Sequence, residues 1–301
     1  MAGLITRFAP SPTGPLHLGH AFAALTAWDL AQTAGGAFLL RMEDIDQPRC
    51  KPEWDTTIRD DLRWLGLSWP EPVMRQSARM PAYGRALAAL GAQGLTYACT
   101  CTRADIRAAL SAPQEGAPVI GPDGPVYPGT CRSKGHQAGH DAPQAAIRLD
   151  MGRAMARLGG MVSFTETGPV YPGQHVFDTA QMVDRVGDIV LARRDIGTSY
   201  HLAVVVDDAA QGVTLVTRGA DLFAATAIHV VLQRLLDMAV PDYHHHRLIR
   251  DEAGKRLAKR DDARALALYR AQGLGPEEIR ALVGLPPPTA RPGLPAHRQP
   301  G

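Results

Sequence analysis

The sequence has little net charge, few aromatic residues and no long apolar run. Its 32 Lys and Arg residues nearly balance 30 Asp and Glu residues, and the resulting formal charge of +2 excludes a strongly basic coat for nucleic acid. Any RNA contact must therefore be local. Aromatic residues make up only 6% of the chain, which argues against a broad surface for base stacking. Because neither a run of about 18 apolar residues nor a signal-peptide pattern occurs, we expect a cytoplasmic protein without a membrane partner.

Cysteine is also scarce, whereas glycine and proline are abundant. Four cysteines are too few for a disulfide scaffold in a chain of 301 residues. The 30 Gly and 24 Pro residues indicate many turns and loops, and a hydrophobic content of 45% is ordinary for a globular protein. The length allows one large domain or two modest ones.

The N-terminal third of the chain alternates between strand and helix patterns. Short apolar runs predict strands at residues 3–8 and 37–46. Helices are predicted from residue 16 to the Gly35-Gly36 pair, from Pro52 onward, and over residues 79–95.

Strand patterns return after a loop-rich segment. Apolar runs at residues 188–193, 200–208 and 212–219 predict buried parallel strands. An amphipathic helix is predicted over residues 221–237, and two short helices over residues 265–274 and 276–285.

Two α/β halves around an insertion predict a doubly wound parallel sheet, with its ligand at the carboxyl ends of the strands. The expected division is a first half of a nucleotide-binding domain at 1–97, an insertion at 98–145, a second half at 146–260, a short helical segment at 261–285 and a Pro-rich, disordered tail at 286–301.

The most informative segment is P-S-P-T-G-P-L-H-L-G-H, from Pro10 to His20. It follows a predicted strand and places two histidines three residues apart, His17 and His20, in the first turn of a helix. Backbone N–H groups and the helix dipole attract anions at that end, and the small Gly19 allows a purine to approach the backbone. The geometry predicts a cradle for a triphosphate. In isolation, such a pair of histidines is more often an ordinary feature of a helix face.

A second cluster contains three of the cysteines. Cys99 and Cys101 are followed, after a stretch rich in Pro and Gly, by Cys131. Three thiolates and one further ligand would form a tetrahedral structural zinc site. From spacing alone, the fourth ligand remains open between Tyr127, His136 and His140, and three reduced thiols without a metal are an equal alternative.

The segment H-L-G-H resembles the HIGH signature of class I aminoacyl-tRNA synthetases, and R-F-A-P-S-P-T-G before it resembles the glutamyl subgroup. The resemblance implies a Rossmann-like catalytic domain and a mobile lysine loop, whose best match here is R-L-A-K-R at residues 256–260. That match departs from the K-M-S-K-S pattern at four of five positions but retains Lys259. Without the upstream motif, a basic run of this kind would be taken as a solvated surface.

The resemblance implies binding of ATP with Mg²⁺. The implied catalytic residues are His17, His20 and Lys259. The implied ATP contacts are Pro10, Ser11, Thr13, Gly14, His17, Gly19, His20, Arg256 and Lys259.

Glutamate carries an ammonium and two carboxylates, so its site needs one acid and at least one arginine. Matches to the glutamyl pattern supply them at the ends of predicted strands. The implied glutamate contacts are Arg7, Ala9, Ser11, Glu43, Tyr200 and Arg218. Which arginine reads which carboxylate stays open, and salt bridges at strand ends are the alternative interpretation.

Only 41 residues follow Arg260, so no large helical anticodon-binding domain is expected. In this the chain resembles the family of glutamyl-Q tRNA(Asp) synthetases, which attach glutamate to queuosine in the tRNA(Asp) anticodon. That family carries a zinc pattern matched by Cys99, Cys101, Tyr127 and Cys131. The resemblance thus implies one structural Zn²⁺ in the insertion, and ATP, L-glutamate and the queuosine-bearing anticodon stem-loop as partners of a monomer.

Two other interpretations compete with this one. The first is a catalytic fragment of an ordinary glutamyl- or glutaminyl-tRNA synthetase, which charges the 3′ end of its tRNA. The second is a non-catalytic tRNA-binding paralogue, suggested by the altered lysine loop. The retained His17, His20 and Lys259 argue against the second, because an inactive copy has no physical reason to keep a phosphate cradle.

Overall fold

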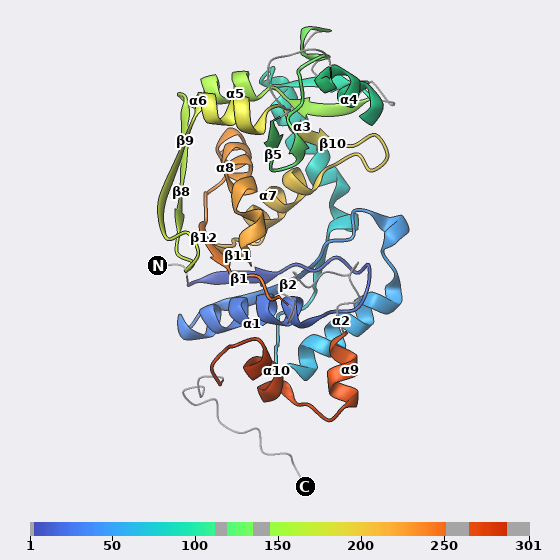
Figure 1. Cartoon of the computed structure of the whole chain (residues 1–301), viewed down its shortest axis with the longest axis vertical. Coiled ribbons are helices and arrows are strands. Elements are labelled where there is room, and N and C mark those ends of the chain that lie inside the picture. Colours follow the sequence, from blue (N-terminus) through green and yellow to red (C-terminus); the bar gives the residue numbers. More distant parts are fainter. Residues whose placement is uncertain (1–2, 112–118, 135–144, 251–264, 288–301) are drawn as a thin grey trace.

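The computed structural model describes residues 3–111, 119–134, 145–250 and 265–287. Figure 1 shows the path of the chain through them. Within this described part of the chain, no helix combines the length and apolar character needed to cross a bilayer. The tail predicted from residue 286 and the lysine loop lie largely or wholly outside the described residues.

The N-terminal strands and helices predicted from sequence are confirmed. Parallel strands pair in the order β1-β2-β3, and Arg7 of β1 lies opposite Leu39 of β2. Helix α1 ends before Gly35, whose φ of +61° suits glycine. The elements are β1 (Ile5–Phe8), α1 (Leu18–Thr33), β2 (Ala37–Met42), α2 (Pro52–Trp64), β3 (Met74–Arg75) and α3 (Met80–Ala92).

A second group of strands continues this layer. The backbone N–H of Thr214 donates to the carbonyl of Ile5 at 3.0 Å, and the Ile5 N–H donates to Thr214 Oγ1 at 2.8 Å, so β11 lies beside β1. β11 and β12 are parallel, as are β12 and β8, and β9 pairs with β8 antiparallel. The strands are β8 (Met161–Glu166), β9 (Gly173–Asp178), β11 (Leu215–Gly219) and β12 (Asp242–His246).

The strand predicted over residues 200–208 is wrong, because these residues form helix α7 (Tyr200–Ala210). A fully apolar run cannot distinguish a buried strand from a buried helix. Ser199 decides the local structure, since its side chain accepts a hydrogen bond from the N–H of Leu202 and caps the helix. Nearly the whole helix is buried, so packing overrides the strand preference of its valines.

A third sheet was not predicted. Its three strands are antiparallel and pair in the order β10-β7-β4, so the fold is mixed α/β and not a single parallel sheet. The chain leaves this sheet at Cys99 and returns to it at Ala146, which are paired neighbours. The elements around it are β4 (Thr96–Cys99), α4 (Arg103–Ser111), β5 (Ile120–Gly121), β6 (Gly124–Pro125), β7 (Ala146–Leu149), α5 (Met151–Arg157), α6 (Thr179–Gln181) and β10 (Val190–Ala192).

The remaining helices agree with the sequence patterns. The helix predicted over residues 221–237 consists of a 3₁₀ stretch, Ala220–Ala225, followed by α8 (Thr226–Leu235). The two C-terminal helices are α9 (Leu266–Ala271) and α10 (Pro276–Leu282). In Figure 1 they lie below α1, and their residues Leu266 and Ile279 are buried in the core around α1.

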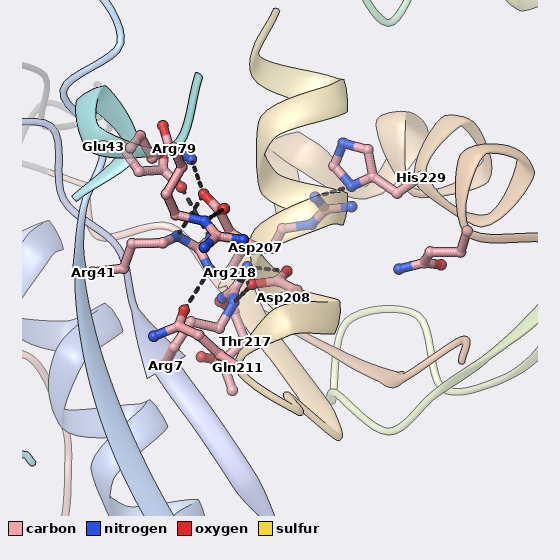
Figure 2. A network of polar contacts seen from close by, with 12 residues as sticks. Arg7, Arg41, Glu43, Arg79, Asp207, Asp208, Gln211, Thr217, Arg218 and His229 are labelled. Atoms are coloured by element: carbon pink, nitrogen blue, oxygen red, sulfur yellow. Dashed lines mark hydrogen bonds and ion pairs between the residues drawn. The ribbon is translucent and has the colours of Figure 1, made fainter. Parts of the chain in front are cut away.

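Buried charges join the N-terminal strands to α7 (Figure 2). Asp208 accepts hydrogen bonds from Arg7 Nε at 2.9 Å and from Arg41 Nη1 at 2.6 Å. Its neighbour Asp207 accepts from Arg79 Nε at 2.5 Å and Tyr83 Oη at 2.7 Å. Burial opposes ionisation of Asp208, but the two arginines outweigh it and lower the pKa of that carboxyl.

We predict that Asp208→Asn lowers the free energy of unfolding by about 3–5 kcal/mol, because two buried guanidinium groups lose their shared anion. Asp195→Asn is the matched control, since Asp195 pairs with Arg193 on the surface and its loss should cost less than about 1 kcal/mol. Urea unfolding measures both.

The lowered pKa of Asp208 also makes the free energy of unfolding depend on pH. The stabilisation by ionised Asp208 is fully present above the ordinary aspartate pKa of about 3.9 and is lost as the pH falls toward the lower pKa of the folded state. Equal losses in D208N and D195N at pH 7 would contradict the prediction.

Candidate active site

His17 and His20 together cap the N-terminus of α1. His17 is the N-cap residue, and its Nδ1 accepts a hydrogen bond from the Gly19 N–H at 3.1 Å. In return, the His17 N–H donates to Nδ1 of His20 at 3.2 Å. The two rings are stacked with their centroids 3.8 Å apart. The predicted pair of imidazoles at a helix N-terminus is therefore present in the structure.

The capping bonds fix the tautomers of both rings. Because each Nδ1 accepts a hydrogen bond, each neutral ring carries its proton on Nε2. Two Nε2–H donors therefore accompany the first backbone N–H groups of α1, an arrangement that suits an anion. A Cβ atom at Gly19 would lie 3.0 Å from Cε1 of His17, so glycine is needed here to leave room for the His17 ring.

The loop between β1 and α1 is held by backbone hydrogen bonds. The carbonyl of Pro10 accepts from the N–H of Glu43 at 3.0 Å, which extends the β1–β2 pairing past the strand ends. Ser11 accepts from the Thr13 N–H at 2.8 Å. Pro10 and Gly14 are buried, Ala9 and Thr13 are partly buried, and Ser11 is exposed. The predicted nucleotide-binding loop thus lies directly beside the end of β2.

The two arginines predicted to read carboxylates have different partners. Arg7 is paired with an anion, because its Nε and Nη2 both donate to Asp208, while its Nη1 donates to the carbonyl of Thr217 at 2.9 Å. Arg218 has only neutral acceptors among the described residues: its Nε donates to Nε2 of His245 at 3.0 Å, its Nη1 to Nδ1 of His229 at 2.9 Å and its Nη2 to Oγ1 of Thr226 at 2.7 Å. Figure 2 shows both arginines.

Glu43 and Tyr200 lie within the electrostatic reach of these arginines. Burial raises the pKa of Glu43, against the opposing charges of Arg41 and Arg7. Burial likewise raises the pKa of Tyr200, with Arg218 and Arg7 opposing and Glu43 reinforcing the shift. The structure therefore brings the predicted acid, the two arginines and the tyrosine together at the carboxyl ends of β1, β2 and β11.

The three clustered cysteines meet around Tyr127. Their sulfur atoms all lie within 4.8 Å of one another, and the Tyr127 hydroxyl is 3.4 Å from the sulfurs of both Cys99 and Cys101. Tetrahedral zinc with Zn–S bonds of about 2.3 Å spaces its sulfurs about 3.8 Å apart, so this group could hold a metal with little movement. His136 and His140 lie outside the described residues.

Protonation within the cluster is uneven. At Cys131 burial opposes ionisation, but hydrogen bonds from Tyr127 and from the Thr100 backbone outweigh it and lower the pKa of the thiol to about 6. Burial raises the pKa of Cys101 and, far above its usual range, that of Tyr127. One thiolate is thus available at neutral pH as a first ligand, and a bound dication would favour ionisation of the others.

Two predicted residues, Arg256 and Lys259, lie outside the described residues. The described chain resumes at Ala265, which forms an antiparallel bridge with His17, and the Leu266 N–H donates to the Leu16 carbonyl at 2.8 Å. Ala265, the first described residue after residue 250, therefore lies beside His17.

Several site residues were missed from the sequence. The sequence patterns indicate no role for the run His244–His246, but His245 is fully buried and accepts a hydrogen bond from Arg218. His229 and Glu166 were not singled out at all. The available signal was weak: His229 is a polar residue on the apolar face of a predicted helix, and only the fold brings Glu166 to His245.

Comparison with known proteins identifies related sequences. A family model described as tRNA synthetases class I (E and Q), catalytic domain, matches residues 3–289. The glutamyl-Q tRNA(Asp) synthetase of Rhodobacter capsulatus is 62% identical over 283 residues, which are 94% of this chain and 100% of that protein. The protein of the same name in Geobacter sulfurreducens is 43% identical over 89% of this chain and 79% of its own length.

Solved structures give the same picture of the fold. The glutamate-tRNA synthetase of Elizabethkingia anophelis has a TM-score of 0.73 and 26% identity, with 93% of this chain and 61% of that chain covered. A methionyl-tRNA synthetase of Mycobacterium tuberculosis bound by methionyl-adenylate has a TM-score of 0.60 at 9% identity, with 94% of this chain and 64% of that chain covered, a likeness of fold alone. The chain thus spans less than two thirds of each of these solved synthetases.

The cap at His17 yields a prediction about stability. His17→Ala removes the side chain that accepts the Gly19 N–H, and we expect the free energy of unfolding to fall by about 1 kcal/mol. His17→Asn restores an efficient N-cap and should recover most of the loss. Urea unfolding of the three proteins checks this, and equal stability of H17A and wild type would contradict the capping role.

Proposed function

The chain belongs to the class I tRNA synthetases of the E and Q type and is a synthetase-like ligase, and from this premise we propose that it transfers glutamate to a tRNA anticodon. In this proposal the enzyme activates L-glutamate with ATP and attaches it to the queuosine base of tRNA(Asp). The main support is that the relatives named for this reaction match along most or all of their own length.

ATP is proposed to lie across the N-terminus of α1. The Nε2–H groups of His17 and His20 and the first backbone N–H groups of the helix are donors for its phosphates, and the loop from Pro10 to Gly14 borders them. Lys259 lies outside the described residues and is assigned to the phosphates by the resemblance of R-L-A-K-R to the lysine loop. In this proposal Arg256 and Lys259 add positive charge for the ATP phosphates, and Mg²⁺ is bound together with the nucleotide.

Glutamate is proposed to bind at the carboxyl ends of β1, β2 and β11. Arg218 is the better reader of its side-chain carboxylate, because its described partners are neutral, whereas Arg7 is neutralised by Asp208. Glu43 offers a carboxylate to the ammonium group, and Tyr200 a neutral hydrogen bond. Ala9 and Ser11 border the same site from the loop after β1.

The proposed reaction needs no covalent bond to the enzyme. The α-carboxylate of glutamate attacks the α-phosphate of ATP, which forms the adenylate and releases pyrophosphate. A hydroxyl of the queuosine cyclopentenediol then attacks the adenylate carbonyl, which forms the ester and releases AMP. The protein positions the reactants and stabilises negative charge on the departing phosphates.

We also propose that Cys99, Cys101, Tyr127 and Cys131 hold one structural zinc. Four ligands leave no open position, so the metal would stabilise the segment between β4 and β7 without taking part in the reaction. This segment would correspond to the insertion at 98–145, between the two halves of the catalytic domain at 1–97 and 146–260.

The decisive substrate is an anticodon stem-loop of tRNA(Asp) that carries queuosine but has no 3′ acceptor end. With ATP and labelled glutamate, we expect label to enter this RNA and not a full-length tRNA(Asp) that lacks queuosine. Lys259→Ala serves as the enzyme control and should reduce the rate by about 10²–10³, the cost of one lost charge-stabilising contact.

Two other outcomes have defined meanings. Label in the unmodified full-length tRNA alone would assign the protein to the enzymes that charge a 3′ end. Glutamate-independent binding of either RNA without any transfer would instead indicate a tRNA-binding paralogue.

For the metal, we predict about one equivalent of zinc in protein that has been stripped with a chelator and resupplied. Cys131→Ser should retain less than about half an equivalent and should melt at a lower temperature. Cys50→Ser is the matched control, because Cys50 lies outside the cluster and should leave the zinc content unchanged. Full zinc content in C131S would exclude this ligand set.

A further inference from the structure

A chain of hydrogen bonds leads from Arg218 to a residue far from it in sequence. Arg218 Nη1 donates to Nδ1 of His229 at 2.9 Å, and Nε2 of His229 lies 3.0 Å from Nδ1 of His201. Nε2 of His201 in turn lies 2.8 Å and 2.9 Å from the two carboxylate oxygens of Asp123. His201 and His229 are both buried. Figure 2 shows the bond between Arg218 and His229.

The donor and the acceptor of every hydrogen bond in this series follow from the groups at its two ends, a guanidinium and a carboxylate. A guanidinium can only donate, so Nδ1 of His229 accepts and its proton must be on Nε2. Nδ1 of His201 therefore accepts a hydrogen bond from the Nε2–H of His229. This leaves the single ring proton of His201 on its own Nε2, which donates to the carboxylate of Asp123. The carboxylate accepts without a proton of its own. Arg218 therefore sets the tautomer of His229, and Asp123 holds His201 from the other end in the one tautomer that can accept from His229.

A second arm holds the opposite side of Arg218. Its Nε donates to Nε2 of His245, whose Nδ1 bonds to the carboxylate of Glu166. The other oxygen of Glu166 accepts from the backbone N–H groups of His245 at 2.9 Å and Gly168 at 2.6 Å. Each arm thus ends on a carboxylate: one imidazole separates Glu166 from the guanidinium, and two separate Asp123 from it.

The two arms start from different parts of the fold. Glu166 lies at the end of β8, in the same sheet as Arg218. Asp123 lies in the turn between β5 and β6, within the segment that also contains the cysteine cluster. Asp123 and Tyr127 line one cavity of about 640 Å³, together with Arg148 and Asp188. The arm through His201 therefore connects the segment of the cysteine cluster to the proposed glutamate site.

We propose that Asp123 is a positioning residue, which acts through His201 and His229 to hold the Arg218 guanidinium ready for the carboxylate of glutamate. The proposal rests on the proposed function, because it takes glutamate as the ligand of Arg218. Loss of Asp123 removes the acceptor of the His201 Nε2–H, so the tautomer of His201 is then held by His229 alone. The hydrogen bond between His229 and the guanidinium is less firmly fixed as a result, while the phosphate-binding groups at α1 are unaffected.

The test uses glutamate-dependent pyrophosphate exchange with the full-length protein. Asp123→Ala should raise the KM for glutamate by about three- to tenfold, the size of one hydrogen bond, with the KM for ATP unchanged. Asp123→Asn should return the KM for glutamate to near the wild-type value, since its amide oxygen can accept from His201. Asp184→Ala is the control, because Asp184 is exposed and is not part of the chain of bonds.

A second variant breaks the same series of hydrogen bonds at His201. His201→Phe keeps a ring of similar size but removes both nitrogen atoms, and it should raise the KM for glutamate as much as D123A does. In the double variant D123A/H201F, the increase should be no larger than in either single variant, because both changes break one path. The H201F measurement against wild type remains available if D123A does not fold.

The outcomes separate this proposal from the proposed function. If the wild-type protein shows no glutamate-dependent exchange, the proposed function fails and Arg218 has another ligand. If the wild type is active but D123A and H201F keep the wild-type KM for glutamate, the positioning role is overturned. Multiplicative effects of the two changes, or equal increases in the KM for glutamate and for ATP, would also overturn it, since they indicate a general loss of structure. Direct calorimetric titration with glutamate should show the same ranking of the variants.

Discussion

The ion-pair network at the end of α7 is the constraint on which the arrangement of the site depends. Asp207 and Asp208 are both buried and receive guanidinium groups from β1, from β2 and from the 3₁₀ turn before α3. Buried charges are tolerated only when they are paired and hydrogen-bonded, so these elements cannot separate without leaving an isolated charge. The network thereby fixes the carboxyl ends of β1 and β2 against α7, and with them Arg7, Glu43 and Tyr200.

The same network explains why two arginines in one site have different roles. Burial of Asp208 requires cations, and Arg7 supplies one through a two-pronged contact. Its Nη1 donates to a backbone carbonyl, and its charge is offset by the bonded carboxylate of Asp208, which makes Arg7 the weaker attractor of an anionic ligand. Arg218 instead donates to two imidazoles and a threonine hydroxyl, which are neutral. Of the two arginines, Arg218 is therefore the one whose charge no carboxylate among the described residues offsets by a direct bond.

Local sequence signals predicted the N-terminal part of the fold well. Pro52 at the first position of α2, Gly35 after α1 and the alternation of apolar runs were sufficient, because each depends on residues close in sequence. Residues 200–208 were assigned to a strand, since a uniformly apolar run has no period and the cap at Ser199 was overlooked. The His245 contacts could not be predicted, because they depend on which strands are neighbours. The roles proposed for the motif residues rest on family resemblance, and those of Arg256 and Lys259 fall outside the described structure.

The two imidazole arms around Arg218 solve a problem that a direct ion pair would create. A carboxylate bonded to the guanidinium would orient it but would also neutralise it and compete with an anionic ligand for its donors. A neutral imidazole accepts one N–H and adds no charge, and the carboxylate behind it only has to fix the tautomer. Arg218 has five N–H groups, of which three donate to His229, His245 and Thr226, and the other two have no hydrogen-bond acceptor among the described residues. Orientation and charge are thus controlled by different groups, which allows distant residues such as Asp123 and Glu166 to influence the site while its positive charge is retained.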